Sequence, residues 1–170
     1  HTEFKDSPVG RIPASWDVVP IKSIVSKVVD NRGKTPPITD CGVELLEINT
    51  ISKDRVHPDY RKVRKFVSQE TYDSWFRAGH PKSGDILIPT VGTIGACSLV
   101  EQNRGSIAQN IIALRLNETV KPNYAYYVLS SEPTVRQIEA ILMNAVQPSL
   151  RVPHFLMLHI VLPPLAEQEK

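Results

Sequence analysis

This 170-residue sequence has few cysteines, little excess of charge of either sign and no long hydrophobic run. Its cysteines, Cys41 and Cys97, lie in unrelated contexts, which excludes a disulfide-rich secreted domain and indicates free thiols in the cytoplasm. The 20 Lys and Arg residues nearly balance the 18 Asp and Glu residues, so the net charge is only +2. That balance gives no overall basicity of the kind that indicates a nucleic-acid partner.

The hydrophobic runs are too short to cross a membrane. The longest uncharged runs, 86–100 and 155–166, contain proline, and neither reaches the ~18–20 apolar residues that a membrane helix requires. We therefore expect no membrane partner. We expect no signal peptide, and from His1 in place of an initiator Met we expect the sequence to begin inside a cloned fragment or a longer protein.

Motifs that carry catalysis are absent as well. The sequence has no Cys-x-x-Cys, no His-Glu-x-x-His and no Gly-x-Ser-x-Gly. The run Gly33-Lys34-Thr35 imitates the end of a phosphate-binding loop, but Val28 stands where that loop has its first glycine. Amino-methyltransferases place Asn or Asp before Pro-Pro, whereas Thr35 and Leu162 precede the pairs here. We predict a non-catalytic protein with no metal and no cofactor of its own.

What the sequence does have is the composition of one globular domain. Hydrophobic residues make up 41% of the chain and charged residues 22%, which is too apolar for a disordered protein. The 14 prolines favour short elements, because the residue before a proline avoids the helical conformation. We predict a single α/β (α+β) domain with a mostly antiparallel twisted sheet and short helices.

The pattern of apolar residues places the elements along the chain. Strands are predicted at 43–51, 61–67, 85–91, 96–100 and 107–116, and 21–29 fits either a strand or a short helix. Helices are predicted at 69–76, 122–129 and 133–143, the first of them capped by Ser68. The segment 155–162 is a last apolar element, and 165–170 begins a helix. The turn Gly92-Thr93-Ile94-Gly95 predicts a hairpin between 85–91 and 96–100.

One short stretch concentrates positive charge. The segment 53–65 has six cations against two carboxylates, a local net charge of +4. Its cations are Lys53, Arg55, Arg61, Lys62, Arg64 and Lys65. Side chains of this kind neutralise DNA phosphates and release counterions. The alternative, a strand and loop that are merely solvated, stays open at this point.

Two loops offer further candidates for binding. The loop 31–37 carries Arg32, Lys34 and Thr35, and an arginine can grip the edge of a guanine with two hydrogen bonds. The turn that holds Thr93 could bring the backbone close to a phosphate, because its glycines have no side chain in the way. Both loops could equally be plain turns. In the strand predicted at 107–116, the neighbouring amides Gln109 and Asn110 predict one buried amide.

Several segments, read in order, resemble the target recognition domain of the specificity subunit of type I restriction–modification enzymes. The matching segments are Gly10-Arg11-Ile12-Pro13 with Trp16, Gly33-Lys34-Thr35-Pro36, Gly84-Asp85-Ile86-Leu87-Ile88 with Gly92-Thr93-Ile94-Gly95, Ile107-Ala108-Gln109-Asn110, Gln147-Pro148-Ser149-Leu150 and Leu162-Pro163-Pro164-Leu165-Ala166-Glu167-Gln168. Together with the residues that lead into the first of them, from Phe4 on, these segments span residues 4–168. The last of them resembles the junction where the family's domain leads into a long conserved helix.

The resemblance implies a non-catalytic reader of double-stranded DNA that recognises one half-site of a bipartite target. Residues 1–162 would form the DNA target recognition domain, and 163–170 the start of the truncated spacer helix. The implied partners are a modification subunit, which binds S-adenosylmethionine and methylates a flipped adenine, and a restriction subunit that uses ATP and Mg²⁺. Those cofactors are expected only on the partner subunits.

The resemblance also gives the candidate residues their expected roles. The six cations of segment 53–65 are expected to contact phosphates, and Arg32, Lys34, Thr35 and Thr93 to lie at or near the bases. Two alternatives remain: a single-domain DNA reader of a related fused restriction–modification enzyme, and a protein-interaction module with only generic affinity for DNA.

Overall fold

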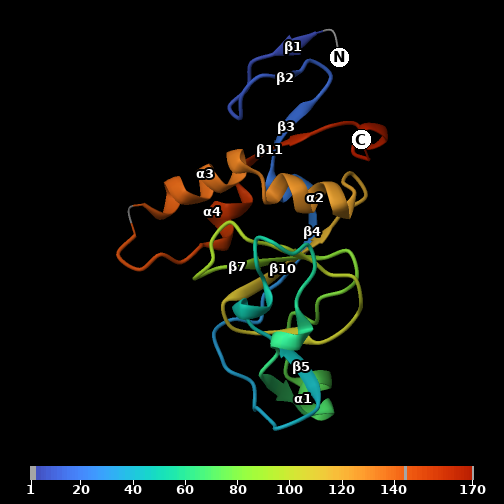
Figure 1. Cartoon of the computed structure of the whole chain (residues 1–170), viewed down its shortest axis with the longest axis vertical. Helices are drawn as coiled ribbons and strands as arrows, with labels where there is room; N and C mark the ends of the chain where they lie inside the picture. Colours follow the sequence, from blue (N-terminus) through green and yellow to red (C-terminus); the bar gives the residue numbers. More distant parts are fainter. Residues whose placement is uncertain (1–2, 144, 170) are drawn as a thin grey trace.

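The computed structural model describes residues 3–143 and 145–169 of the chain. The molecule is elongated (Figure 1). The hairpin of β1 (Phe4–Lys5) and β2 (Ile12–Pro13) lies at one end, and β5 (Val43–Leu46) with α1 (Gln69–Ser74) lies at the other. Within the described residues the strands form four small sheets, in which every strand pair but one is antiparallel. The predicted α/β domain with antiparallel sheets and short helices is therefore confirmed.

The largest sheet occupies the middle of the molecule. Its order is β4 (Val25–Val29), β10 (Ile111–Leu116), β7 (Ile86–Pro89) and β8 (Ser98–Leu99). Every residue of β7 and the first four of β10 are buried, so side chains on both faces of these strands are covered. This two-sided burial explains why the two strands are continuously apolar instead of alternating.

Three helices cover one face of this sheet. They are α2 (Pro122–Leu129), α3 (Glu132–Leu142) and α4 (Val152–Leu156). Ile138 and Phe155 from these helices share one core cluster with Leu114 of β10. The opposite face packs on a second cluster that includes Leu46 and Ile51. The central sheet is thus held between a helical layer and a layer formed by the end of β5 and the segment that follows it.

The lower end of the molecule contains the only parallel pair among the described residues. β5 (Val43–Leu46) lies between β6 (Lys65–Val67), which is antiparallel to it, and β9 (Ser106–Ile107), which is parallel. The helix α1 (Gln69–Ser74) follows β6 at this end (Figure 1). Ser68 caps α1 by accepting a hydrogen bond from the Thr71 N–H at 3.1 Å, as the sequence predicts.

The upper end joins residues from both ends of the chain. β1 (Phe4–Lys5) pairs with β2 (Ile12–Pro13), and β3 (Asp17–Pro20) pairs with β11 (His159–Leu162). Beyond β11 the chain forms one turn of 3₁₀-helix, Leu165–Glu167, and the Trp16 Nε1–H donates to Glu167 Oε2 at 3.0 Å. The part of 165–170 that is described is thus a 3₁₀ turn docked on the domain.

The predicted elements differ from the structure mainly in length. The strands predicted at 43–51 and 61–67 are cut short by 3₁₀ turns at Ile48–Thr50 and Tyr60–Lys62. The segment 21–29, predicted as either a strand or a short helix, contains one of each: a 3₁₀ turn at Ile21–Ile24 followed by the strand β4. The helices predicted at 122–129 and 133–143 are confirmed within one residue, and β7 and β8 pair as the predicted hairpin.

The single strand predicted at 107–116 is wrong. The chain leaves β9 at Ile107, turns through 108–110 and starts β10 at Ile111, with Asn110 in the left-handed region at a φ of 64°. Gln109 and Asn110 are both exposed, so the predicted buried amide is also wrong. Turning out of the sheet lets both amides reach solvent and removes the cost of burying either of them.

No helix in the described ranges is both long enough and apolar enough to span a lipid bilayer.

Candidate nucleic-acid interface

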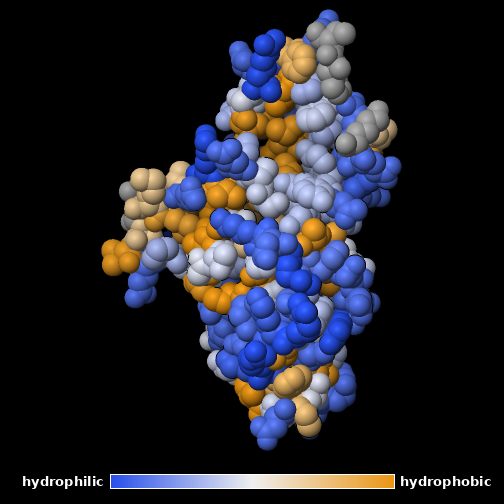
Figure 2. Space-filling view, viewed as in Figure 1, coloured by the Kyte–Doolittle hydropathy of each residue, from blue (hydrophilic) through white to orange (hydrophobic). Residues whose placement is uncertain are grey.

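The basic segment 53–65 is an irregular stretch that holds its cations at the surface. It runs from the 3₁₀ turn after β5 to the start of β6, and all six of its Lys and Arg side chains are exposed. In the view of Figure 2, hydrophilic side chains cover much of the lower half of the molecule, where Figure 1 shows β5 and α1. This part of the chain therefore carries positive charge at the surface, where Arg61 pairs with Asp59 and Lys65 with Glu47.

Within the segment, Asp59 fixes the backbone and the side chain of Arg61. The carboxylate is only 7% exposed, and its Oδ1 accepts hydrogen bonds from the N–H and the Nε–H of Arg61 at 3.2 and 2.9 Å. The Nη2 of Arg61 donates to Asp59 Oδ2 at 2.9 Å. This hydrogen bonding lowers the pKa of Asp59 to about 2. Asp59 is therefore ionised at neutral pH and holds Arg61 from one side.

An arginine from another part of the chain extends the basic segment. Arg104 lies over the ring of Tyr60, with its guanidinium carbon 4.2 Å from the ring centre. Its Nε and Nη2 also donate to Glu44 Oε1, at 2.9 and 2.6 Å. The loop before β9 is thereby docked on the basic segment. The sequence analysis missed Arg104 because it lies about 40 positions along the chain from Tyr60.

The second candidate region is the loop 31–37, whose base is fixed by Asn31. The Nδ2 of this buried side chain donates to the carbonyls of Gly79 and Ile107 at 2.9 and 3.2 Å, and its Oδ1 accepts from the Ala78 N–H at 2.9 Å. All of these partners are main-chain groups inside the protein. Asn31 thus positions the loop and is not directed at a ligand.

Arg32, the next residue, is held by Asp30. Its Nε donates to Asp30 Oδ1 at 2.9 Å and its Nη2 to Asp30 Oδ2 at 2.8 Å, while its own N–H also reaches Oδ1 at 3.1 Å. These hydrogen bonds lower the pKa of Asp30. The side chain of Arg32 retains 28% exposure. The sequence analysis identified Arg32 but missed its carboxylate partner two positions earlier.

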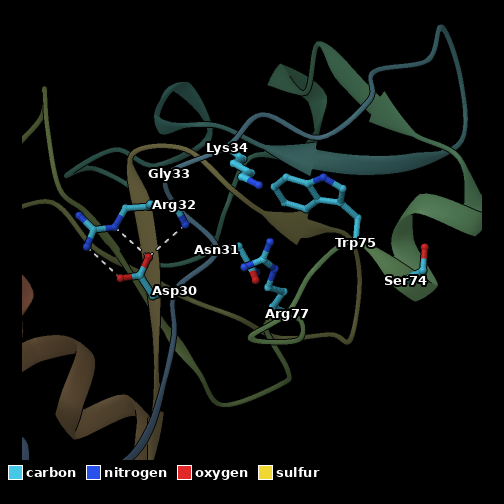
Figure 3. A pocket seen from close by; sticks show the side chains of 8 residues that line it. All are labelled: Asp30, Asn31, Arg32, Gly33, Lys34, Ser74, Trp75 and Arg77. Atoms are coloured by element: carbon cyan, nitrogen blue, oxygen red, sulfur yellow. Dashed lines mark hydrogen bonds and ion pairs between the residues drawn. The ribbon is translucent and has the colours of Figure 1, made fainter.

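A pocket of about 540 Å³ opens beside this loop. It is lined by Asp30, Asn31, Arg32, Gly33, Lys34, Ser74, Trp75 and Arg77. In Figure 3, Lys34 and Arg77 lie near the indole of Trp75. The guanidinium of Arg32 points instead toward Asp30, away from that indole. The sequence analysis missed Trp75 and Arg77, because only folding brings the end of α1 next to the loop 31–37.

The remaining candidates lie at the edges of these two regions. Thr35 is exposed and accepts a hydrogen bond from Gln109 Nε2 at 3.4 Å, which links the loop 31–37 to the turn before β10. Thr93 is exposed in the loop between β7 and β8. Gly95 of that loop lines a pocket of about 140 Å³ together with Lys53, so the loop lies beside the start of the basic segment.

The described residues offer no cluster of three or more His, Cys, Asp or Glu side chains that could hold a metal ion. Burial raises the pKa of the Cys97 thiol to about 12, so this cysteine is a protonated core residue at neutral pH. What the two regions provide chemically is therefore positive charge, oriented guanidinium groups and one indole. Those groups suit the recognition of anionic and hydrogen-bonding surfaces such as DNA.

Comparison with known proteins gives one family. The profile described as "Type I restriction modification DNA specificity domain" matches residues 13–170. Among curated proteins, the type I restriction enzyme MjaVIII specificity subunit of Methanocaldococcus jannaschii is 26% identical over 176 residues, covering 99% of this chain. The putative MjaX specificity subunit of the same organism is 25% identical over 174 residues, covering 98%. The chain spans 40% of the length of each of these relatives.

Solved structures show the same fold. The HsdS subunit from Thermoanaerobacter tengcongensis superposes with a TM-score of 0.65 at 17% identity, over 98% of this chain and 37% of that one. A chain from a study of complex assembly and conformational transition of the type I R-M system gives a TM-score of 0.65 at 18% identity, over 98% of this chain and 38% of its own.

Proposed function

Because the chain belongs to the family of type I restriction modification DNA specificity domains, we propose that it reads one half-site of a bipartite target in double-stranded DNA. The observation that carries this proposal is the basic segment 53–65, which presents six exposed cations in a chain of net charge +2. Positive charge gathered at the surface attracts phosphates, and oriented donors distinguish base edges.

The proposal gives the chain a recognition role without chemistry of its own. Residues 1–162 would form the recognition domain, and 163–170 would lead into a spacer helix. The chain would act in the cytoplasm with a modification subunit that binds S-adenosylmethionine and a restriction subunit that uses ATP and Mg²⁺. The names of its relatives support such partners, because they describe specificity subunits of type I restriction enzymes.

The candidate residues divide between two kinds of DNA contact. Lys53, Arg55, Lys62, Arg64 and Lys65 would contact phosphates, which position the domain without reading sequence. Lys34, Thr35 and Thr93 would lie at or near the bases. Arg32 and Arg61 each have a carboxylate partner two positions earlier, and this geometry supports a more specific role for both.

Selection from a pool of randomised duplexes tests this function. The chain would be used alone and again with its modification subunit, and bound duplexes would be sequenced after each round. We expect one short motif that contains an adenine to be enriched. Binding without any enrichment, with affinity that only falls as salt rises, would instead indicate a protein-interaction module with a generic basic surface.

A further inference from the structure

Two arginines of this chain are held in the same way by two different aspartates. In Asp30-Asn31-Arg32 and in Asp59-Tyr60-Arg61, the aspartate Oδ1 accepts from the N–H and the Nε–H of the arginine two positions later. In both, Oδ2 accepts from Nη2, at 2.8 Å for Arg32 and 2.9 Å for Arg61. We call this arrangement the Asp-x-Arg fork. It occurs once in each of the two candidate regions.

The fork leaves one edge of each guanidinium available. An arginine carries five N–H donors, of which the aspartate uses the one on Nε and one of the two on Nη2. The donors left over include one on Nη1 and one on Nη2 that lie side by side at the tip of the side chain. For Arg32 and Arg61, no other acceptor within residues 3–143 and 145–169 is bonded to these nitrogens.

Arg115 shows how a purely structural pair differs. Its Nε and Nη2 bind Asp85 in a similar way, at 3.2 and 2.8 Å, but its Nη2 also donates to the His80 carbonyl at 3.0 Å. Both hydrogens on Nη2 are thus used inside the protein, and no pair of donors remains at the tip. Asp85 also lies 30 positions away, so the contact joins distant parts of the fold.

The chemistry of the free edge selects its ligand. Two parallel N–H donors at the tip of an arginine match the O6 and N7 acceptors of guanine in the major groove. An arginine that is already fixed loses less conformational entropy when it binds, and its donors hold one direction. A phosphate contact has less need of such fixing, because a flexible lysine also supplies one as a point charge.

We propose that Arg32 and Arg61 determine sequence specificity by reading guanine bases, and that Asp30 and Asp59 are positioning residues that hold the two arginines. This inference rests on the proposed function, because it requires a chain that reads DNA. It changes the role expected for Arg61 from a phosphate contact to a base contact. The 78% exposure of the Arg61 side chain leaves its tip open to a ligand.

The test compares variants that keep the charge and lose the fork. Affinity is measured by fluorescence anisotropy for the duplex that the chain selects and for a shuffled duplex, over a range of salt concentrations. Arg61→Lys should weaken binding to the selected duplex roughly ten- to a hundredfold. It should leave the shuffled duplex and the dependence on salt unchanged, since the charge is kept. Arg32→Lys should behave alike.

Asp59→Asn tests the positioning role separately from the charge of Arg61. We expect it to lower the preference for the selected duplex over the shuffled duplex, and the lost negative charge should slightly strengthen binding to the shuffled duplex. Because an amide replaces an ionised carboxylate that accepts hydrogen bonds from Arg61, the melting temperature should fall, so affinities are measured where circular dichroism shows the variant folded. Arg136→Lys is the matched control, because Arg136 is an exposed arginine that also pairs with a carboxylate, Glu132, but lies on α3 outside both candidate regions. It should change neither preference nor affinity.

A modified base identifies the atom that is read. Replacing a guanine of the selected duplex by 7-deazaguanine removes the N7 acceptor. At the position that Arg61 reads, this replacement should weaken the wild-type chain and leave Arg61→Lys unaffected. If Arg61→Lys and Arg32→Lys bind the selected duplex as tightly as wild type, the inference is overturned while the proposed function stands. If wild type selects no motif, both are overturned.

Discussion

At the scale of single residues, the buried carboxylate of Asp85 ties the central sheet to the loop before it. It is 3% exposed, pairs with Arg115 and accepts a hydrogen bond from the Lys82 N–H at 2.8 Å. Replacing Asp85 by Ala should lower the free energy of unfolding by about 3 kcal/mol, because it leaves the Arg115 charge without its partner. Urea denaturation measures this loss. Glu44→Ala, at a more exposed pair, is the control and should cost about 1 kcal/mol or less.

Gly42 is a second residue whose identity the fold requires. It has a φ of +136°, and a Cβ at this position would lie 2.3 Å from the carbonyl oxygen of Val67 on the neighbouring strand. Gly42→Ala should therefore destabilise the chain by about 3 kcal/mol, through contact and backbone strain together. Gly10 also has a positive φ, +108°, but a Cβ added there would have no atom within 4 Å. Gly10→Ala should therefore lower the free energy of unfolding by only about 1 kcal/mol. Equal losses for the two variants would contradict this account.

Arg64 is expected to act on DNA through its charge alone. Arg64→Ala should weaken binding to every duplex by a similar factor and reduce the slope of log affinity against log salt by about 0.9. Titrations of selected and shuffled duplexes at several salt concentrations measure both quantities. A shift in the preferred sequence would instead show that Arg64 contacts a base.

At the scale of elements, an aromatic cluster joins α1 to β9. His80 stacks on Tyr72 with 3.7 Å between ring centres, and its Nδ1 lies 2.8 Å from the Ser106 hydroxyl. Burial lowers the pKa of His80 below its ordinary value of 6.5, against smaller effects from Tyr72 and Asp73 that raise it. The neutral ring is therefore the form that suits the folded chain.

This shift predicts how stability depends on pH. The unfolded chain binds a proton at His80 more readily than the folded chain, so the free energy of unfolding should fall as pH drops below about 6.5. The loss should continue until pH passes the lower pKa of the folded chain. His80→Gln should show a smaller loss than wild type between pH 7 and pH 5 in urea denaturation. The control is His154→Gln, at an exposed position, which should lose as much unfolding free energy between pH 7 and pH 5 as wild type does.

The sequence predicts the elements that are set by local signals and misses those set by packing. Pro122 marks the start of α2 and Ser68 that of α1, because each acts on its own turn of helix. The break between β9 and β10 depends on the left-handed backbone of Asn110, which no periodicity reveals. β9 also pairs in parallel with β5, some 60 positions away, so its register is set by tertiary contacts.

The candidate site likewise combines residues that the sequence reveals with residues that only folding brings together. Segment 53–65 is visible in the sequence because its cations are close together along the chain. Trp75 and Arg77 join the loop 31–37 only through folding, so sequence patterns could not identify them. The Asp-x-Arg forks lie between these cases. Their residues are two positions apart, but only the structure shows that the side chains meet.

At the scale of the whole molecule, charge is distributed unevenly along an elongated domain. Segment 53–65 carries +4 in a chain of net charge +2, so the rest of the chain is slightly acidic. Near-neutral composition therefore conceals a local attraction for phosphates. The proposed function uses the two regions that hold fixed arginines in two ways, binding DNA through charge and selecting among sequences through hydrogen bonds.

The most direct test of this account measures the affinity of the chain for its selected duplex and for every single-base-pair change within it, at one salt concentration near physiological. We expect a short run of positions at which a change weakens binding roughly tenfold or more, and no effect outside that run. Equal affinity for all of these duplexes would contradict the central claim that the chain reads sequence.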